Sequence, residues 1–269
     1  MFRNWRWKMT KSIELRKDGE IAEVLLNRPE TFNAFDLDMV ELFSKYLINL
    51  AADDSVSVLV ISGKGKAFCA GGDLKWVHGF PGGPAAGFHE LAARYHQAIL
   101  EIRRMRKPVV AAINGIAAGG GFSLALACDF RVMAQSAALR QAYTSNGLCI
   151  DGGGTFTLPR LVGLARAMEI VGFDKPISSE QALVWGLVTK VAEDGRALEE
   201  AWNMAHELAK ISLNSFGWCK ELLTDSFHTT FETQIERERR GISNCGAHPD
   251  GQEGLKAFAD RRKPIFNVK

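Results

Sequence analysis

The chain has 269 residues, of which 46% are hydrophobic and 24% charged, a composition typical of a globular protein with one large core or a core plus a smaller helical part. Its formal net charge is only +2, from 33 basic and 31 acidic residues, which argues against nucleic acid or an anionic membrane as the main partner. No stretch approaches the roughly 18 apolar residues of a transmembrane helix.

The cysteines and histidines predict no metal site and no disulfide framework. The five cysteines are odd in number and widely spaced, so a reducing cytoplasm fits best. Among the six histidines, His89 and His96 lie seven positions apart on an expected helix. We expect these histidines to be solvated or to cap helices, because no further ligand accompanies them.

The N-terminal part predicts an extension, a hairpin and a helix. Residues 1–10 are basic and aromatic without an apolar run of signal-peptide length, so we expect a loose extension. Strands at 13–16 and 21–26 flank Asp-Gly, a hairpin signal. The segment 27–34 contains a proline and two asparagines and is expected to be a loop, after which Asp36 can cap a helix running to about residue 52.

Two glycine-rich turns then follow two apolar strands. The strand at 58–61 leads to Gly71, Gly72 and an aspartate, and the strand at 108–113 leads to the glycines of 114–121 and a buried helix at 122–128. The first N–H groups of a helix have no partner, and a turn without Cβ atoms lets a ligand oxygen approach them. Two such donors suggest a hole for one oxyanion, as acyl chemistry requires.

The remainder predicts an α/β class with a helical C-terminal part. A Pro/Gly-rich loop at 80–87 precedes a helix at 88–105, and further strands are expected at 130–134 and near residue 187. After residue 196 we expect helices only. Their predicted ranges are 197–210, 216–225, 231–245 and 251–262.

Three motifs resemble the enoyl-CoA hydratase/isomerase (crotonase) superfamily. They are Phe-Cys-Ala-Gly-Gly-Asp-Leu at 68–74, Asn-Gly-Ile-Ala-Ala-Gly-Gly-Gly at 114–121, and Gly-Gly-Gly-Thr at 152–155, with the similarity running from residue 26 to 264. The resemblance implies a ClpP/crotonase-like spiral of ββα units in residues 11–195. It also implies that residues 196–269 form a helical oligomerisation region of a homotrimer or a dimer of trimers.

The resemblance also implies an acyl-CoA site, with coenzyme A as part of the substrate and no separate cofactor. The N–H groups of Gly72 and Gly120 would hold a thioester carbonyl as it becomes an enolate. Trp76 is implied as a pocket wall, although ordinary core packing explains it as well. The implied contacts with coenzyme A are Glu30, Thr31, Ala34, Ala70, Asp73, Leu74 and Arg261. Asp73 also has the pattern of a helix N-cap, and Arg261 that of a solvated basic face.

The chain departs from the hydratase members, which carry two glutamates where Ser123 and Tyr143 stand here. Serine is no base near neutral pH, and tyrosine, with an ordinary pKa of about 10, is a poor one. Asp151 instead provides one carboxylate, as in family isomerases such as the dienoyl-CoA and the ring-1,2-epoxyphenylacetyl-CoA isomerases. A single carboxylate can take a proton from one carbon and return it to another. By spacing alone, Asp151 is equally a turn residue that caps the next helix.

The resemblance and these residues therefore predict an acyl-CoA isomerase that acts on a double bond, or on an epoxide or oxepin, with Asp151 as the base and Ser123 and Tyr143 as pocket groups. A hydratase using Asp151 and an ordered water is the first alternative. A hydrolase or decarboxylase of the same fold is another. A non-catalytic acyl-CoA- or RNA-binding subunit is a third, to which the balanced charge gives little support.

Overall fold

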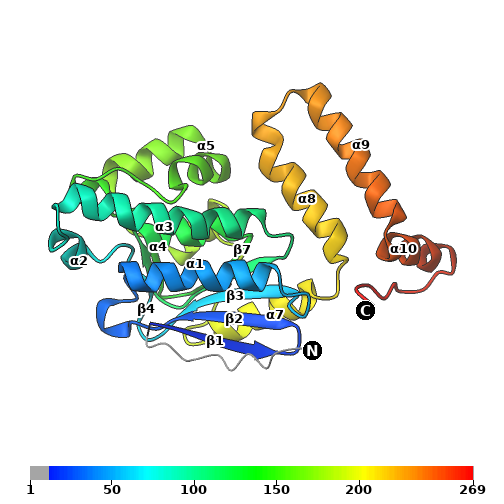
Figure 1. Cartoon of the computed structure of the whole chain (residues 1–269), viewed down its shortest axis with the longest axis horizontal. Coiled ribbons are helices and arrows are strands. Elements are labelled where there is room, and N and C mark those ends of the chain that lie inside the picture. Colours follow the sequence, from blue (N-terminus) through cyan, green and yellow to red (C-terminus); the bar gives the residue numbers. More distant parts are fainter. Residues whose placement is uncertain (1–11, 269) are drawn as a thin grey trace.

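The computed structural model describes residues 12–268, so the expected extension at 1–10 lies outside the described residues. Its main sheet has six strands in the order β1-β2-β3-β5-β7-β10 (Figure 1). β1 and β2 are antiparallel and all other neighbours are parallel. The bounds are β1 (Ile13–Asp18), β2 (Ile21–Leu26), β3 (Val58–Gly63), β5 (Val109–Ile113), β7 (Phe130–Ala134) and β10 (Lys190–Ala192).

The predicted hairpin is confirmed, with its turn one residue later than the Asp-Gly signal suggested. Asp18 pairs with Ile21, which leaves Gly19 and Glu20 as the turn. Gly19 has a φ of 57°, a left-handed conformation that a two-residue hairpin requires and glycine adopts without strain.

Both faces of the main sheet are buried, as expected for parallel strands covered by helices. Val58 and Val60 of β3 point to one face and pack with α7 (Ala197–Leu208). The alternate residues Leu59 and Ile61 point to the other face and join the larger core, which also includes the second sheet. The alternation follows from the two-residue period of a strand.

A second sheet of four short strands lies in the order β4-β6-β8-β9. Their bounds are β4 (Ala67–Cys69), β6 (Ile116–Ala118), β8 (Ala138–Arg140) and β9 (Ile177–Ser178). β4, β6 and β8 are parallel, and β9 pairs with β8 in the antiparallel direction. Each of the three parallel strands follows a strand of the main sheet and precedes a helix, so the chain winds as ββα units. The predicted α/β spiral is confirmed.

Six helices of the described chain precede α7. They are α1 (Leu37–Ala51), α2 (Leu74–His78), α3 (Pro84–Arg104), α4 (Gly120–Ala127), α5 (Gly154–Phe173) and α6 (Ser179–Val184), with short 3₁₀ turns at Pro29–Thr31, Thr144–Asn146 and Ser226–His228. α1 and α3 lie side by side across the molecule (Figure 1). α3 begins four residues earlier than predicted, because Pro84 suits the first turn of a helix, where its missing N–H costs nothing.

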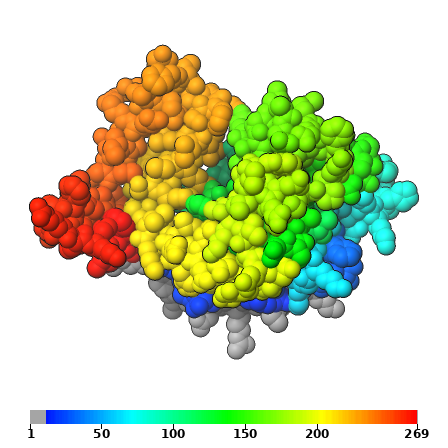
Figure 2. Space-filling model, turned by 180° about the vertical axis from the view of Figure 1, so that it is seen from behind, coloured from blue at the N-terminus to red at the C-terminus, as the bar shows by residue number. Residues whose placement is uncertain are grey.

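The C-terminal helices are α7, α8 (Leu213–Asp225), α9 (Phe231–Ala247) and α10 (Pro249–Ala259), as predicted. α8 and α9 form a hairpin that stands away from the sheets, with α10 at the far end (Figure 1). From behind, the surface is notched between this hairpin and α5 (Figure 2), although the turn between α8 and α9 contacts α5, with the His228 and Phe156 ring centroids 5.0 Å apart. The division of the chain into a core and an oligomerisation region stays a prediction.

The strand expected near residue 187 lies at β10 instead. Leu187 and Val188 are buried, but their N–H groups bond to the carbonyl of Ala182 and close the turn after α6. Pairing with β7 begins only at Lys190.

A buried ion pair ties α8 to the core. Lys220 Nζ lies 2.7 Å from Asp129 Oδ2 and also donates to the carbonyls of Ile102 and Lys107. Burial raises the pKa of the Asp129 carboxyl, although Lys220 opposes this shift. Asp129 thus has a structural role. Within residues 12–268, no helix is both long and apolar enough to cross a membrane.

Candidate active site

A cavity of about 350 Å³ lies where both glycine turns meet α3 and the loop before α5. Its volume is that of a small-molecule site, with mostly apolar walls and few polar groups, as such sites usually have. The lining consists of Phe35, Ala70, Gly72, Leu74, Phe88, Leu91, Ala92, Tyr95, Gly119, Gly120, Ala142, Tyr143, Asn146, Leu148, Cys149 and Asp151. The predicted catalytic positions Gly72, Gly120 and Asp151 therefore share one cavity.

Two residues of the cavity lining, Gly72 and Gly120, have backbone N–H groups without a hydrogen-bond acceptor in the described chain. Phe35 N–H donates to the carbonyl of Gly71 at 2.7 Å, and Asp73 N–H donates to the carbonyl of Phe35 at 2.8 Å. This parallel bridge leaves the N–H of Gly72 pointing away from Phe35. Gly120 is the first residue of α4, so its N–H has no partner within the helix. Among residues 12–268, no acceptor forms a hydrogen bond with the N–H of Gly72 or of Gly120.

The two turns touch, which is why they need glycine. Gly71 has a φ of 94°, and a Cβ there would lie 2.6 Å from Gly120 N. A Cβ at Gly121 would lie 2.0 Å from the carbonyl oxygen of Cys69. Real Cβ atoms do not approach other atoms this closely, so a larger residue would push the turns apart. The pairing of the two elbows, inferred from sequence, is confirmed as contact.

Tyr95 of α3 holds the second turn, and nothing in the sequence singled it out. Its hydroxyl donates to the carbonyl of Gly120. The side chain is buried, and burial raises the pKa of Tyr95 well above its ordinary value. A Cβ at Gly152 would lie 2.4 Å from the Tyr95 ring. Tyr95 thus packs between the start of α4 and the loop that carries Asp151.

The Asp151 carboxylate reaches the cavity with two neighbours. Oδ1 accepts a hydrogen bond from the Tyr143 hydroxyl at 2.5 Å, and Oδ2 lies 3.4 Å from Nε2 of His96. The side chain is 34% exposed, so solvent or a ligand can reach it. The N-cap of α5 is Gly153, without a side-chain bond. Asp151 therefore does not cap this helix, which was its alternative interpretation.

Tyr143 serves as a hydrogen-bond donor to Asp151. Burial raises the pKa of Tyr143 far above its ordinary value, and the negative charge of Asp151 raises it further. The phenol consequently stays protonated and cannot act as a base near neutral pH. The structure agrees with its predicted place in the pocket.

Ser123 lies behind the cavity and is not among its lining residues. It is fully buried, and its Oγ donates to the backbone carbonyl of Asp151 at 2.8 Å. The Oγ lies against Gly154, where an added Cβ would come within 2.7 Å of it. A side chain longer than serine at position 123 would therefore require the loop to shift. Ser123 supports the loop rather than facing a ligand.

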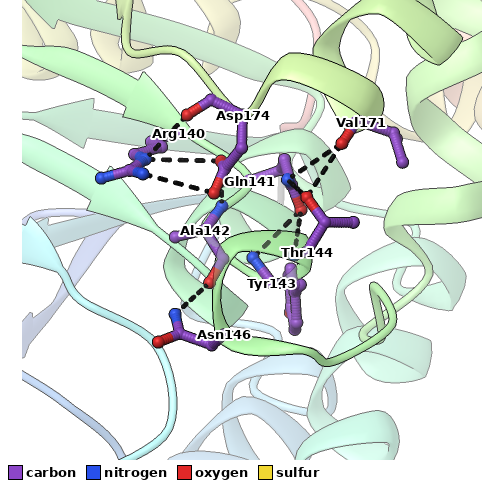
Figure 3. Close-up of polar contacts among 8 residues, drawn as sticks. All are labelled: Arg140, Gln141, Ala142, Tyr143, Thr144, Asn146, Val171 and Asp174. Carbon is purple, nitrogen blue, oxygen red and sulfur yellow. Dashed lines mark hydrogen bonds and ion pairs between the residues drawn. The ribbon is translucent and has the colours of Figure 1, made fainter.

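The loop that presents Tyr143 is anchored at its start (Figure 3). Gln141 is fully buried, and its Oε1 accepts hydrogen bonds from the N–H groups of Tyr143, at 3.0 Å, and Thr144, at 3.3 Å. Its Nε2 lies 3.5 Å from the carbonyl of Val171. Ala142 has a φ of 52°, an uncommon left-handed conformation for a residue with a Cβ.

Asp174 holds that strained residue in place. Its Oδ1 accepts the N–H of Ala142 at 2.8 Å, and its carboxylate pairs with Arg140 at 3.4 Å (Figure 3). Burial alone would raise the pKa of Asp174, but hydrogen bonds from Ser145, the Ala142 N–H and Arg140 outweigh it and lower this pKa. The ionised carboxylate therefore stabilises the loop.

His96 is exposed, as expected, and it also contacts Asp151. Besides its 3.4 Å approach to the carboxylate, its Nε2 accepts the N–H of Gly152 at 3.2 Å. His89, its predicted neighbour on α3, is exposed. No group of three or more possible metal ligands occurs in the described part of the chain.

The residues expected to contact coenzyme A fall into separate places. Ala70 and Leu74 line the cavity, whereas Ala34 is buried beside it. Glu30 and Thr31 belong to the 3₁₀ turn at 29–31. None of the last three is among the lining residues.

Asp73 is an N-cap, as its pattern predicted. It accepts the N–H groups of Lys75 and Trp76, both at 3.2 Å, and pairs with Arg28 at 3.1 Å. Trp76 packs against Phe80, with ring centroids 5.0 Å apart, and is not among the lining residues.

Arg261 follows α10, and α10 lies on the opposite side of the molecule from α2 (Figure 1). It is exposed. The described chain therefore does not bring Arg261 to its own cavity.

The chain is similar to known proteins over nearly its whole length. The chain matches the enoyl-CoA hydratase/isomerase family over residues 16–269. It is 34% identical to the 1,2-epoxyphenylacetyl-CoA isomerase of Escherichia coli K12, covering 93% of this chain and 95% of that protein. It is 33% identical to 4-chlorobenzoyl coenzyme A dehalogenase-2 of an Arthrobacter species, covering 91% and 88%.

A solved structure shares the fold almost throughout. The crystal structure of an enoyl-CoA hydratase from Polaromonas sp. JS666 superposes with a TM-score of 0.90 at 34% identity, covering 95% of this chain and 99% of that one. Because both the sequence match and the superposition span nearly the whole chain, this protein belongs to the enoyl-CoA hydratase/isomerase family.

Proposed function

We propose that this protein isomerises an acyl-CoA thioester through an enolate, with Asp151 as the group that moves the proton. The observation that carries the proposal is the meeting of Asp151 with two unpartnered N–H groups, those of Gly72 and Gly120, in one cavity of about 350 Å³. The N–H groups suit a thioester oxygen that gains charge, and Asp151 is the one carboxylate in the lining.

The chemistry proceeds in two proton transfers. Asp151 takes a proton from the carbon beside the thioester carbonyl, and the electron pair of that C–H bond moves into the carbonyl, whose oxygen becomes an enolate held by Gly72 and Gly120. The carboxyl of Asp151 then returns a proton to another carbon of the conjugated system, and the electrons return from the oxygen. The double bond has migrated and the base is restored.

Tyr143 fits this role for Asp151. Its hydroxyl keeps Oδ1 in place and leaves Oδ2 available for the moving proton. Because the pKa of Tyr143 is raised by burial, the phenol does not compete for that proton.

Hydration is the second candidate, favoured by the exposure of the base. Asp151 is 34% exposed and the neighbouring His96 is 48% exposed, which leaves a route for a water molecule to the carboxylate. Asp151 would then activate this water for addition to an enoyl-CoA. The same site would also suit other acyl-CoA reactions, including the dehalogenation named for one relative.

A panel of CoA thioesters, incubated in ¹⁸O-labelled water and followed by mass spectrometry, separates these functions. The panel includes 2-enoyl, 3-enoyl, epoxyphenylacetyl and 4-chlorobenzoyl thioesters. We expect an isomer without ¹⁸O. Gain of ¹⁸O at carbon identifies hydration, ¹⁸O with chloride release identifies dehalogenation, and binding without any turnover identifies a non-catalytic acyl-CoA-binding protein.

We further propose a homotrimer or a dimer of trimers, acting in the cytoplasm without a cofactor. The C-terminal helices expose large apolar side chains such as Phe227 at 64%, Phe231 at 74%, Ile242 at 73% and Phe258 at 87%. Such surfaces in a folded chain usually become interfaces. Sedimentation that finds only monomers at micromolar concentration would contradict this assembly.

Arg261 then contacts the coenzyme A bound by a neighbouring copy. Arg261→Ala should weaken binding of an acyl-CoA but not of the matching pantetheine thioester, which lacks the distal phosphates. Titration of both ligands against the wild type and the variant measures the difference. Equal weakening of both would remove Arg261 from the phosphate site.

A further inference from the structure

We propose that His96 carries protons between Asp151 and the solvent, so that the proton taken from the substrate is exchanged before one is returned. The proposal rests on Asp151 acting as the base, as proposed above. His96 does not line the cavity, so it is a positioning residue that acts on the substrate only through Asp151.

The imidazole lies beside the carboxylate and is the more exposed of the two side chains. Its Nε2 is 3.4 Å from Oδ2 of Asp151, and the His96 side chain is 48% exposed against 34% for Asp151. Tyr143 occupies the other oxygen, Oδ1. A ligand in the cavity covers the side of Asp151 that lines it. The remaining contact of the carboxylate, through Oδ2, leads to His96.

The same nitrogen of His96 also accepts a backbone hydrogen bond, which favours one tautomer of the neutral ring. Gly152 N–H lies 3.2 Å from Nε2 and can only donate. Nε2 therefore carries a lone pair, and the ring proton of the neutral imidazole is on Nδ1. While Asp151 is ionised, its Oδ2 and the Nε2 lone pair are both acceptors, so no hydrogen bond forms between them. Once Asp151 carries a proton on Oδ2, this hydroxyl can donate to Nε2 in place of the Gly152 N–H, which loses its acceptor when the imidazolium forms.

The proton transfer balances in each step. Asp151, protonated by the substrate, donates from Oδ2 to Nε2, which gives a carboxylate and an imidazolium. The imidazolium releases its Nδ1 proton to water and returns to a neutral ring. The reverse sequence delivers a solvent proton to Asp151, which then protonates the enolate. Only the bonds to the transferred protons form and break in these steps.

The other titratable groups around the pair do not take part. Tyr143 contacts Asp151, and Tyr95 lies next to His96 with ring centroids 6.1 Å apart. Burial raises the pKa of both phenols well above the ordinary value, so both stay protonated. On the same helix, Arg94 is paired with Glu41 of α1 and with Glu90.

Deuterium exchange at the carbon beside the carbonyl of phenylacetyl-CoA tests the relay, because this thioester forms an enolate but has no double bond to move. The wild type, His96→Gln, Asp151→Asn and the control His89→Gln are compared in heavy water by mass spectrometry. Glutamine at 96 can still accept from Gly152 N–H and donate to Asp151, but it carries no proton onward. His89 is exposed on the same helix, so His89→Gln makes the same chemical change away from the site.

We expect rapid exchange in the wild type and in His89→Gln, none in Asp151→Asn, and exchange slower by about 10²-fold in His96→Gln. Thioester affinity and melting temperature should be unchanged in His96→Gln. Free imidazole should restore exchange to His96→Ala, which a purely structural role would not allow. The turnover product of His96→Gln should also retain the proton of the substrate, whereas that of the wild type contains deuterium.

Two failures remain distinguishable. If the wild type and His96→Gln exchange at the same rate, Asp151 is the base but His96 is no relay. If Asp151→Asn exchanges as fast as the wild type, or if the wild type neither exchanges deuterium nor isomerises a thioester, the proposed function falls together with the relay. Nitrogen-15 spectra of His96 give a check without turnover, since a ring protonated on Nε2 rather than Nδ1 would also overturn the proposal.

Discussion

The two sides of the cavity work through different parts of the chain. On one side, the turns at Gly71–Gly72 and Gly119–Gly120 supply backbone N–H groups. These turns must approach each other closely, which they can do only without side chains. On the other side, the loop before α5 presents Asp151, held by Tyr143, and its requirement is the right side chains in the right direction. A backbone site is damaged by adding atoms, whereas the side-chain site is damaged by removing a functional group.

The largest effect is expected from the side-chain side. Asp151→Asn keeps the shape and a hydrogen-bonding group but removes the base, so turnover should fall by about 10²–10⁴ while thioester binding stays near normal. Steady-state kinetics and direct binding measurements of the same thioester separate the two quantities. Normal turnover by this variant would reduce Asp151 to a loop residue.

The next effect is expected from the backbone side. Gly71→Ala would place a Cβ 2.6 Å from Gly120 N, in a backbone with a φ of 94°, and should displace the N–H groups from the thioester oxygen. Loss of one such donor typically costs about 10²–10³ in rate. Gly72→Ala is the matched control, because its Cβ would meet only the end of the Leu91 side chain, at 3.2 Å. Equal rates of the two variants would show that close approach of the turns is unimportant.

A smaller effect is expected from the tyrosines, one on each side. Tyr143→Phe removes a hydrogen bond to a charged group, worth about 1.5–3 kcal/mol, so turnover should fall roughly 10- to 100-fold. Tyr95→Phe removes a hydrogen bond to the neutral carbonyl of Gly120, worth about 0.5–1.5 kcal/mol, and should reduce turnover less. Steady-state kinetics of both variants show which of the two tyrosine hydrogen bonds contributes more to turnover. A larger loss in Tyr95→Phe would reverse the ranking and make the backbone side the more sensitive one.

The same contrast explains what the sequence could predict. The glycine turns were predictable, because the need for positive φ and close approach leaves a pattern of glycines next to apolar strands, and the Asp73 cap followed the same local rule. The short strands β4 and β6 were not predicted, since three residues are too few to show an alternation.

The surroundings of Asp151 were only partly predictable. The resemblance gave the position of the carboxylate, and the sequence placed Tyr143 eight residues before it. The hydrogen bond between them depends on the positive φ of Ala142 and on buried Gln141, which are tertiary features. His96 comes from a different helix, so no local spacing connects it with Asp151.

The smallest effect is expected at the anchor of the Tyr143 loop, and it depends on pH. Because the pKa of Asp174 is lowered in the folded protein, its contribution to stability is present above the unfolded pKa of about 3.9 and is lost as the pH falls through the lowered folded value. Asp174→Asn should therefore lower the melting temperature near neutral pH and make little difference in strong acid, where the wild-type carboxylate is protonated.

Asp174→Asn can still donate or accept one hydrogen bond, but it loses the charge that pairs with Arg140 and favours the Ala142 N–H. Turnover near neutral pH should fall by less than in Tyr143→Phe, since the Tyr143 hydroxyl itself remains and only its backbone support is weakened. Thermal unfolding of the wild type and the variant between pH 7 and the acid range provides the measurement. A constant difference in melting temperature across this range would mean that Asp174 stabilises the loop through shape alone, because a contribution from the ionised carboxylate must vanish as that carboxylate is protonated.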